Sequence, residues 1–172
     1  HHERLAARQR LLHAPAAAMA VQDALGNVAR YDYSGHLMVQ RTDRTGLSFY
    51  FGYDGLDASA YCVRTWGDGG IYDHTLVYDK ENRRTIVTNS LGASTVYDMN
   101  EALLVVKVTD AHGGTTEYTY DDQLREVREV GPSGEKSETE YDARGNIVRV
   151  VDPGGGETRT EYDERNLATR LI

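Results

Sequence analysis

The sequence predicts an all-β protein whose tandem antiparallel hairpins form a curled or spiral sheet. Three observations support this fold class. Eight of the 12 tyrosines are followed directly by aspartate. A second turn signal, an Asp, Asn or Gly followed three residues later by Gly, recurs between these pairs. The segments between the turns alternate apolar and polar residues, as strands do when one face of a sheet is shielded. Repetition on this length scale indicates one supersecondary unit used many times.

The Tyr-Asp pairs set the period of the repeat. Seven of them form a ladder with steps of 22, 25, 19, 23, 21 and 21 residues. The tyrosines of this ladder are Tyr31, Tyr53, Tyr78, Tyr97, Tyr120, Tyr141 and Tyr162. The eighth pair, Tyr72-Asp73, falls within the longest step. We therefore expect one hairpin of about 21 residues for each pair, with a tyrosine at a structural position in each.

The second turn signal lies between successive Tyr-Asp pairs. Its first positions are Asp43, Asn89, Asp110, Gly131 and Asp152, and the last four are 21 residues apart. Its closing glycines, which we expect to be structural, are Gly46, Gly92, Gly113, Gly134 and Gly155. Asp or Asn bonds its own backbone two residues on, and Gly accepts a positive φ. Two turn signals in each period predict two strands in each period.

The turn that follows each Tyr-Asp pair has the same chemistry. Three residues after the aspartate stands a type that tolerates the left-handed region in five of seven copies: Gly35, Asp57, Asn82, Gly145 and Asn166. Glu101 and Leu124 are the exceptions. Both kinds of turn are therefore predicted to be type I turns closed by a left-handed residue, which is the three-residue hairpin loop.

Loop length determines which side chains share a face. Valine stands four residues before the second turn at Val39, Val106, Val127 and Val148. A three-residue loop at Asp152 pairs Val148 with Thr160, so that Val, Thr and Tyr occupy one face, whereas a two-residue loop inverts that set. The apolar pattern favours the three-residue loop. A tyrosine that shares its face with valine and threonine is expected to be a scaffold or cavity lining before it is a recognition surface.

Two segments depart from the repeat. Residues 1–20 form a non-repeat lead-in, in which His1-His2 resemble a purification tag and residues 3–12 favour a short helix. Residues 21–172 are the repeats, with an atypical insertion around 54–77. This insertion contains Trp66 beside a glycine cluster. A wide turn is predicted there, with Trp66 either covering an edge of the sheet or binding a ligand.

Composition and motifs argue against several functions. The net charge of −8 disfavours nucleic acid, and no apolar run is long enough to span a membrane. Phosphate-loop, G-x-S-x-G and H-E-x-x-H motifs are absent, the histidines lack metal spacing, and Cys62 is the only cysteine. Many aspartates stand at turn positions, where backbone capping explains them. We expect no enzyme activity, and no catalytic, cofactor or metal residues.

The repeat resembles a known family. Residues 141–163, YDARGNIVRVVDPGGGETRTEYD, look like the YD repeat of the Rhs (rearrangement hot spot) family, and the resemblance covers about residues 21–172. Residues 43–55 and 62–74 are similar to the early shell region of bacterial Rhs toxins linked to type VI secretion. YD repeats also occur in insecticidal toxin complexes and in animal teneurins, which the chain resembles less.

The resemblance implies a function as well as a fold. It implies a segment of a β-cage that encapsulates a C-terminal polymorphic toxin and helps to deliver it as an effector. The implied partners are the rest of the shell and the enclosed toxin, and the implied location is the bacterial cytoplasm before export and then a target cell. About seven repeats are too few for a closed cage, so a fragment is expected, whose free edge strands invite pairing or oligomerisation. A carbohydrate- or protein-binding repeat module is the alternative.

Overall fold

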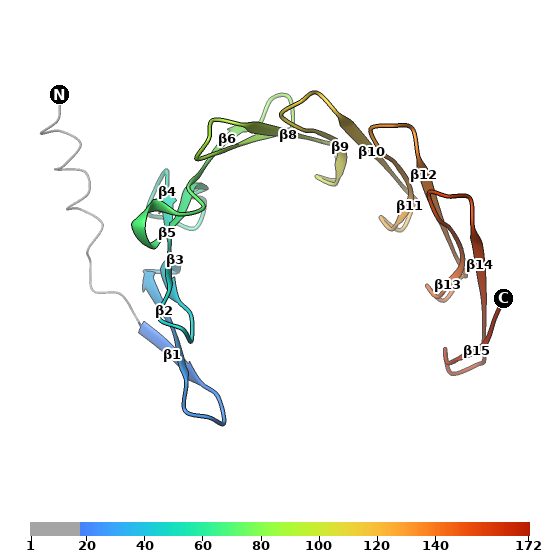
Figure 1. The fold of residues 1–172 in the computed structure, drawn as a ribbon, viewed down its shortest axis with the longest axis horizontal. Helices are drawn as coiled ribbons and strands as arrows, with labels where there is room; N and C mark the ends of the chain where they lie inside the picture. Colours follow the sequence, from blue (N-terminus) through green and yellow to red (C-terminus); the bar gives the residue numbers. More distant parts are fainter. Residues whose placement is uncertain (1–17) are drawn as a thin grey trace, which may run out of the picture. The chain divides into compact units, whose positions relative to one another are not determined.

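The computed structural model describes residues 18–172, and they form an all-β structure (Figure 1). Fifteen antiparallel strands follow one another in chain order, so each strand is paired with its neighbours in the sequence. Helical structure in these residues is confined to the 3-10 turn Asp68–Gly70. The predicted tandem hairpins are confirmed. The tag and the short helix expected before residue 18 lie outside the described residues.

The strands are short and of similar length. Their bounds are β1 Ala18–Gln22, β2 Val28–Ser34, β3 Leu37–Thr42, β4 Ser48–Tyr53, β5 Cys62–Gly67, β6 His74–Asp79, β7 Arg84–Asn89, β8 Ser94–Met99, β9 Val105–Thr109, β10 Thr115–Tyr120, β11 Glu126–Val130, β12 Lys136–Tyr141, β13 Ile147–Val151, β14 Glu157–Tyr162 and β15 Ala168–Leu171. Strand β1 thus begins three residues before the expected start of the repeats and forms a hairpin with β2.

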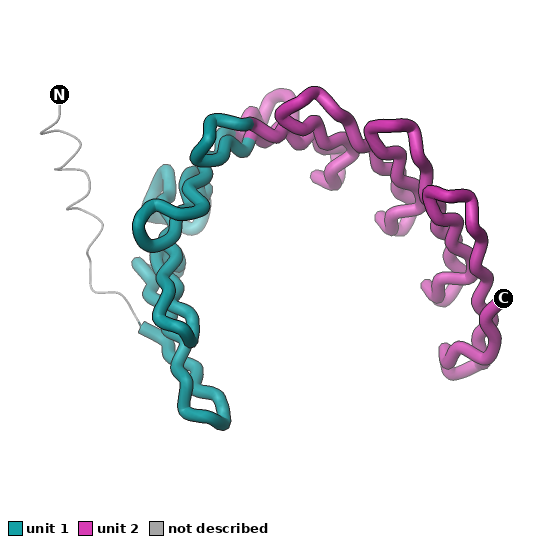
Figure 2. Tube along the Cα trace, in the orientation of Figure 1, with its two compact units in different colours: residues 1–77, 87–93 teal, residues 78–86, 94–172 magenta. Residues whose placement is uncertain are grey.

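The chain divides into two compact units (Figure 2). Unit 1 comprises the residues up to 77 together with 87–93, and unit 2 comprises residues 78–86 and 94–172. Unit 1 contains the atypical insertion. Unit 2 contains β8 to β15, the most regular repeats of the chain.

The described residues bury very few side chains. Ala29, Leu37, Ser48 and Gly67 are the buried residues among those described, and no large side chain among them is fully buried. Globular domains usually pack two layers around a core. Here most strand residues are only half-buried. Each hairpin is consequently stabilised mainly by the hairpins beside it, as in other repeat arrays.

The three-residue loops are confirmed at the glycine turns. At Asp152 the backbone N–H donates to the carbonyl of Gly156 over 2.8 Å, and the Gly155 N–H donates back to the Asp152 carbonyl over 2.9 Å. Gly155 has a φ of 85°. The other predicted glycines, Gly46, Gly92, Gly113 and Gly134, have φ between 79° and 91°. The register of β13 and β14 is that of the predicted three-residue loop, with Arg149 opposite Arg159, and the ladder ends at this pair, one residue before Val148.

A β-bulge follows each Tyr-Asp turn whose register is known. In the hairpin of β12 and β13, Glu140 lies opposite Arg149 but Tyr141 lies opposite Ile147, so Val148 is an extra residue. The same shift leaves Val39, Val106 and Val127 as extra residues in their hairpins. The valines that the sequence analysis grouped together therefore share a bulge position. A bulge bends its strand and removes one residue from the ladder.

The left-handed residue of the Tyr-Asp turns is only partly as predicted. Gly35, Gly145 and Asn166 have positive φ, as expected. The prediction was wrong for Asn82, because Arg83 takes that conformation while the Asn82 side chain bonds Asp79. It was also wrong for Asp57, whose carboxylate instead accepts the Ser59 N–H.

Both residues named as exceptions lie in turns that need a positive φ. Leu124 adopts it directly, with a φ of 63°. In the turn containing Glu101, Leu103 adopts it, with a φ of 60°. That turn starts at Asn100, two residues later than a turn beginning at Asp98, because the Asn100 side chain caps it. A side-chain cap, more than the type of the fourth residue, decides where the turn begins.

The strained turn at Leu124 gives a first prediction. A non-glycine residue pays about 1–2 kcal/mol in the left-handed region, so Leu124→Gly should raise the free energy of unfolding by about 0.5–1 kcal/mol. Leu91 is the matched control, because it is also exposed in a turn but Gly92 supplies the positive φ there. Leu91→Gly should lower stability by about 0.5–1 kcal/mol. Urea unfolding of both variants measures the difference, and equal shifts would contradict the argument.

Candidate functional site

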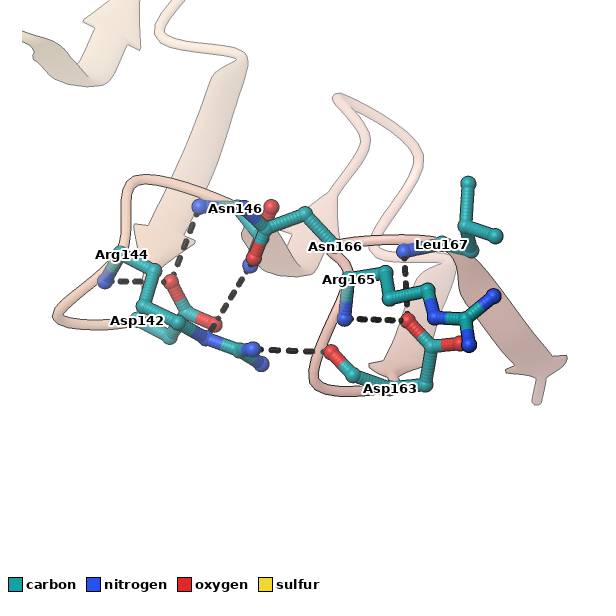
Figure 3. A network of polar contacts seen from close by, with 7 residues as sticks. All are labelled: Asp142, Arg144, Asn146, Asp163, Arg165, Asn166 and Leu167. Atoms are coloured by element: carbon teal, nitrogen blue, oxygen red, sulfur yellow. Dashed lines mark hydrogen bonds and ion pairs between the residues drawn. The ribbon is translucent and has the colours of Figure 1, made fainter.

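In the last three Tyr-Asp turns, at Asp121, Asp142 and Asp163, the aspartate of the pair caps the turn that follows it. The Asp142 Oδ1 accepts the backbone N–H of Arg144 over 2.8 Å and of Asn146 over 2.9 Å (Figure 3). The same two bonds, to the second and fourth following residues, recur at Asp23, Asp43, Asn89, Asn100, Asp110, Asp121, Asp152 and Asp163. One side-chain device therefore closes turns at both ends of the hairpins.

Neighbouring turns in unit 2 are also bonded to one another. The Arg144 guanidinium donates to the Asp163 carbonyl over 2.8 Å, in the next Tyr-Asp turn (Figure 3). The Asn146 amide donates to the Asp142 carboxylate over 2.9 Å and to the Asn166 side-chain oxygen over 3.0 Å. These contacts link the equivalent turns of successive repeats, which is how an array gains stability from its neighbours.

The turn at Gly131 lacks the capping side chain and uses a substitute. The Glu135 carboxylate accepts the Ser133 backbone N–H over 2.9 Å and also the Ser133 hydroxyl. It occupies the space that a side chain at Gly131 would fill. The loop keeps the same backbone bonds, from the Gly131 N–H to the Glu135 carbonyl and from the Gly134 N–H to the Gly131 carbonyl. The glycine signal predicted the turn, but the residue that caps it was not anticipated.

The tyrosine of the pair binds the preceding hairpin. The Tyr120 hydroxyl donates to the Val105 carbonyl over 2.8 Å, and the Tyr141 hydroxyl donates to the Glu126 carbonyl over 3.1 Å. Tyr53 makes the same bond to the Met38 carbonyl, at 2.8 Å. The two partners are 15 residues apart in all three cases. Burial raises the pKa of the Tyr53 and Tyr120 hydroxyls, so both remain donors at neutral pH.

The bulge explains why a hydroxyl is needed at this point. The ladder between β11 and β12 ends at Arg128 and Glu138, just before the extra residue Val127 turns β11 away. The carbonyl of Glu126 therefore lies beyond the last ladder pair. A carbonyl without a ladder partner is available to accept a hydrogen bond from elsewhere, and the phenol of Tyr141 supplies the donor from the next hairpin.

The structure separates the tyrosines that the sequence treats alike. Tyr141 lies opposite Ile147, the first residue of the strand that follows its turn, and Met99 holds the same position opposite Val105. Tyr97 therefore lies two residues before the position that Tyr141 has in its own repeat. Tyr33 likewise holds that position opposite Met38, in place of Tyr31. Counted by structure, the positions 99, 120, 141 and 162 are 21 residues apart. The uneven steps of the Tyr-Asp ladder in this part thus hide a regular period.

Trp66 lies within the sheet. It stands in β5 opposite Tyr50, and β5 is paired with β4 on one side and β6 on the other. Its ring is stacked on the Tyr50 ring, with 5.6 Å between centroids, and the Arg64 guanidinium lies 4.8 Å from its centroid. The expectation that Trp66 covers an edge was therefore wrong, because the wide turn begins after it at Asp68. Its role in binding a ligand stays a prediction.

Asp68 explains the wide turn of the insertion. Its carboxylate accepts the backbone N–H of Ser48 over 2.8 Å and the Tyr50 hydroxyl over 2.8 Å. This bond raises the pKa of the Tyr50 hydroxyl. The glycine-rich turn folds back so that its first residue bonds two residues of β4, and the aromatic stack of Tyr50 and Trp66 lies beside that contact.

The capping carboxylates predict acid-sensitive stability. The amide of Asn146 and the backbone N–H groups of Asn146 and Arg144 lower the pKa of Asp142, and the N–H groups of His112 and Gly114 lower the pKa of Asp110. A folded-state pKa below the unfolded value of about 3.9 stabilises the fold above that pH, and this stability is lost as the pH falls through the lowered pKa. Thermal unfolding measured between neutral pH and about pH 2 should show that loss.

A matched pair of variants tests the cause. Asn89 and Asn100 cap their turns without a charge. Asp142→Asn should therefore keep the turn while reducing the pH dependence, whereas the exposed Asp122→Asn should leave the pH dependence as it is in the parent chain. If Asp142→Asn did not change the pH dependence at all, the capping carboxylates would not be its source.

Metal binding, membrane insertion and thiol chemistry are three further possibilities for residues 18–172. Among these residues, no group of three or more His, Cys, Asp or Glu side chains is arranged to hold a metal ion. The same residues include no helix long and apolar enough to cross a membrane. The sulfur of Cys62 lies 3.5 Å from the Arg64 carbonyl, and burial raises the pKa of its thiol.

Comparison with known proteins agrees with the repeat geometry. Residues 141–172 match the model of the RHS Repeat family. The match begins at Tyr141 and covers the Tyr-Asp turns at Asp142 and Asp163, together with the glycine turn at Asp152. The chain matches no curated protein.

Proposed function

We propose that this chain is a structural segment of the shell of an Rhs polymorphic toxin, because residues 141–172 match the RHS Repeat family model. In this role the hairpins form part of the wall of a β-cage that encapsulates a C-terminal toxin and helps to deliver it. The chain itself carries out no catalysis. Its partners are the rest of the shell and the enclosed toxin, and it passes from the bacterial cytoplasm into a target cell through type VI secretion.

The observation that carries the proposal is the single-layer sheet formed by residues 18–172, whose first and last strands are exposed. The terminal strands β1 and β15 are exposed along their whole lengths, and Met19 and Leu171 are 59% and 73% exposed. A sheet without a second layer or covered edges is stabilised by more of the same sheet. Hydrogen bonds also join neighbouring hairpins: the hydroxyls of Tyr53, Tyr120 and Tyr141 bind the hairpin before them, and Arg144 binds the next Tyr-Asp turn. These features fit a wall built by continued addition of repeats.

Limited proteolysis of the parent polypeptide tests the proposal. The C-terminal region that follows the repeats should be resistant in the parent protein and digested quickly when it is produced alone. Mild denaturation that opens the repeats should abolish the resistance. Equal digestion rates in the parent and in the isolated region would show that the repeats do not enclose it. A parent protein that ended shortly after these repeats would have no region to enclose.

A further inference from the structure

The sheet of unit 2 has two chemically different faces. Side chains opposite one another across antiparallel strands share a face, as do residues two apart. One face, which we call the tyrosine face, follows this register through Tyr118, Tyr120, Thr139, Tyr141, Val150 and Thr160. Among the strand residues of β8 to β15, the register places no lysine or arginine on the tyrosine face; the basic residue beside that face is Arg125, which lies in the turn before β11 and covers the Tyr141 ring.

The opposite face balances its own charges. Arg149 bonds Glu140 over 2.8 Å and Glu157 over 3.0 Å. Arg170 lies 3.6 Å from Glu161, across the next bulge. A face of paired charges is suited to water, because antiparallel sheets usually expose one polar face and shield the other. The tyrosine face is therefore the side that lacks a covering layer.

Two carboxylates interrupt the tyrosine face. Glu126 lies opposite Tyr120 and Glu129 lies opposite Tyr118. Residues three apart on a strand would normally point to opposite faces. Here the extra residue Val127 lies between them, so the bulge brings both glutamates to the side of the tyrosines.

The repeats on either side carry apolar residues at these positions. Twenty-one residues later stand Ile147, opposite Tyr141, and Val150, opposite Thr139. Twenty-one residues earlier stand Val105, opposite Met99, and Val108, opposite Tyr97. The fold therefore does not require glutamate there. A residue pair that breaks the pattern of its repeat without a structural gain marks a functional position.

The glutamate pair also lacks a cation. In the part of the chain that the structure describes, neither Glu126 nor Glu129 forms an ion pair, whereas Glu138, Glu140, Glu157 and Glu161 on the other face do. Burial, followed by the charge of Glu129, raises the pKa of Glu126. Arg125, next to Glu126 in the sequence, is bonded to Asp121 and lies over the Tyr141 ring, and Arg128, next to Glu129, lies opposite Thr119 on the other face. The two acids are thus left to repel each other.

We propose that the tyrosine face of unit 2 docks a polypeptide segment that inserts an arginine or lysine side chain between Glu126 and Glu129. The apolar neighbours of that cation pack on the tyrosine and valine side chains. Tyrosine offers large contact area at low entropic cost, and its ring face attracts cations. Opposite charges give such a contact its specificity. The inference rests on the proposed function in one respect: the segment belongs to the part of the polypeptide that the shell encloses.

Peptide binding to the chain tests the contact. The probe is a short fluorescent peptide with a central arginine flanked by leucines, and its partner replaces that arginine with citrulline, which is neutral and of similar shape. Fluorescence anisotropy should show the citrulline peptide binding roughly tenfold or more weakly, as expected for a lost charged hydrogen bond. Equal affinities, or no binding of the arginine peptide at about 1 mM, would overturn the proposal.

Two double variants locate the contact. Glu126→Gln with Glu129→Gln should abolish the preference for arginine, and Glu138→Gln with Glu140→Gln, on the opposite face, should preserve it. Glu126→Ile with Glu129→Val installs the residues of the following repeat. We expect it to lose the preference while unfolding at higher urea concentration than the parent chain. A purely structural role for the glutamates predicts the reverse change in stability, and that result would overturn the proposal.

The two proposals fail in different ways. If the parent protein protects its C-terminal region equally well with and without the Glu126→Ile, Glu129→Val replacement, and the peptide shows no preference for arginine, the docking site is wrong and the shell stands. If the peptide preference is present but the C-terminal region is not protected, the surface binds basic segments and the enclosing function is wrong.

Discussion

Replacement of Trp66 by alanine should lower the free energy of unfolding by roughly 2–4 kcal/mol, somewhat less than for a fully buried tryptophan. The indole is stacked on Tyr50 and lies under the Arg64 guanidinium, and Gly52 lies close to its edge. Truncation removes the aromatic and cation contacts together and opens a gap between β4 and β5. Leu56→Ala is the control in the same insertion, because Leu56 is 63% exposed and should change stability by less than about 0.5 kcal/mol.

This result separates a scaffold from a binding module. If Trp66 stabilises unit 1, Trp66→Ala unfolds at a lower urea concentration than the parent chain. The conservative Trp66→Phe then loses only part of that stability. If Trp66 serves a ligand, the unfolding free energy stays within about 0.5 kcal/mol of the parent value and saturable binding to glycans or proteins is lost. The second outcome would favour the carbohydrate- or protein-binding alternative over the shell.

The turns were the part of the fold that the sequence predicted best. Their chemistry is local: Asp152 bonds N–H groups two and four residues away, and Gly155 needs only its own φ. Such interactions depend on few neighbours, so their residue types recur at a constant spacing. The register of β13 with β14, in which Arg149 lies opposite Arg159, followed from the loop length alone.

Long-range contacts were predicted less well, for a physical reason. The bond from Tyr141 to the Glu126 carbonyl joins two hairpins. Its acceptor is a backbone atom, which every residue type has, so the amino-acid sequence does not reveal it. Nor does any residue type announce the bulge at Val127, because valine suits an ordinary strand equally well. The contrast of Glu126 with Ile147 was readable in the sequence, but the bulge was needed to show that Glu126 and Glu129 share a face.

Tyr120→Phe should lower the free energy of unfolding by about 1–3 kcal/mol, because it removes the hydroxyl that binds the half-buried carbonyl of Val105. The phenyl ring remains, so packing on the tyrosine face is preserved. The control is Tyr97→Phe, because Tyr97 in β8 is the tyrosine of the preceding Tyr-Asp pair. Tyr97 stands two residues before the position equivalent to Tyr120, which Met99 occupies. Tyr97→Phe should therefore change the free energy of unfolding by less than about 0.5 kcal/mol.

The comparison tests what the Tyr-Asp repeat is for. If the pair were only a mark of strand propensity, both substitutions would have similar, small effects, because phenylalanine and tyrosine favour strands alike. If the hydroxyl joins each hairpin to the one before it, Tyr120→Phe destabilises unit 2 and Tyr97→Phe does not. Hydrogen exchange gives the spatial readout: amides of β9 and β10 should lose protection in Tyr120→Phe before those of β13 and β14. An array linked in this way loses stability first at the missing contact, because each hairpin depends on its immediate neighbours.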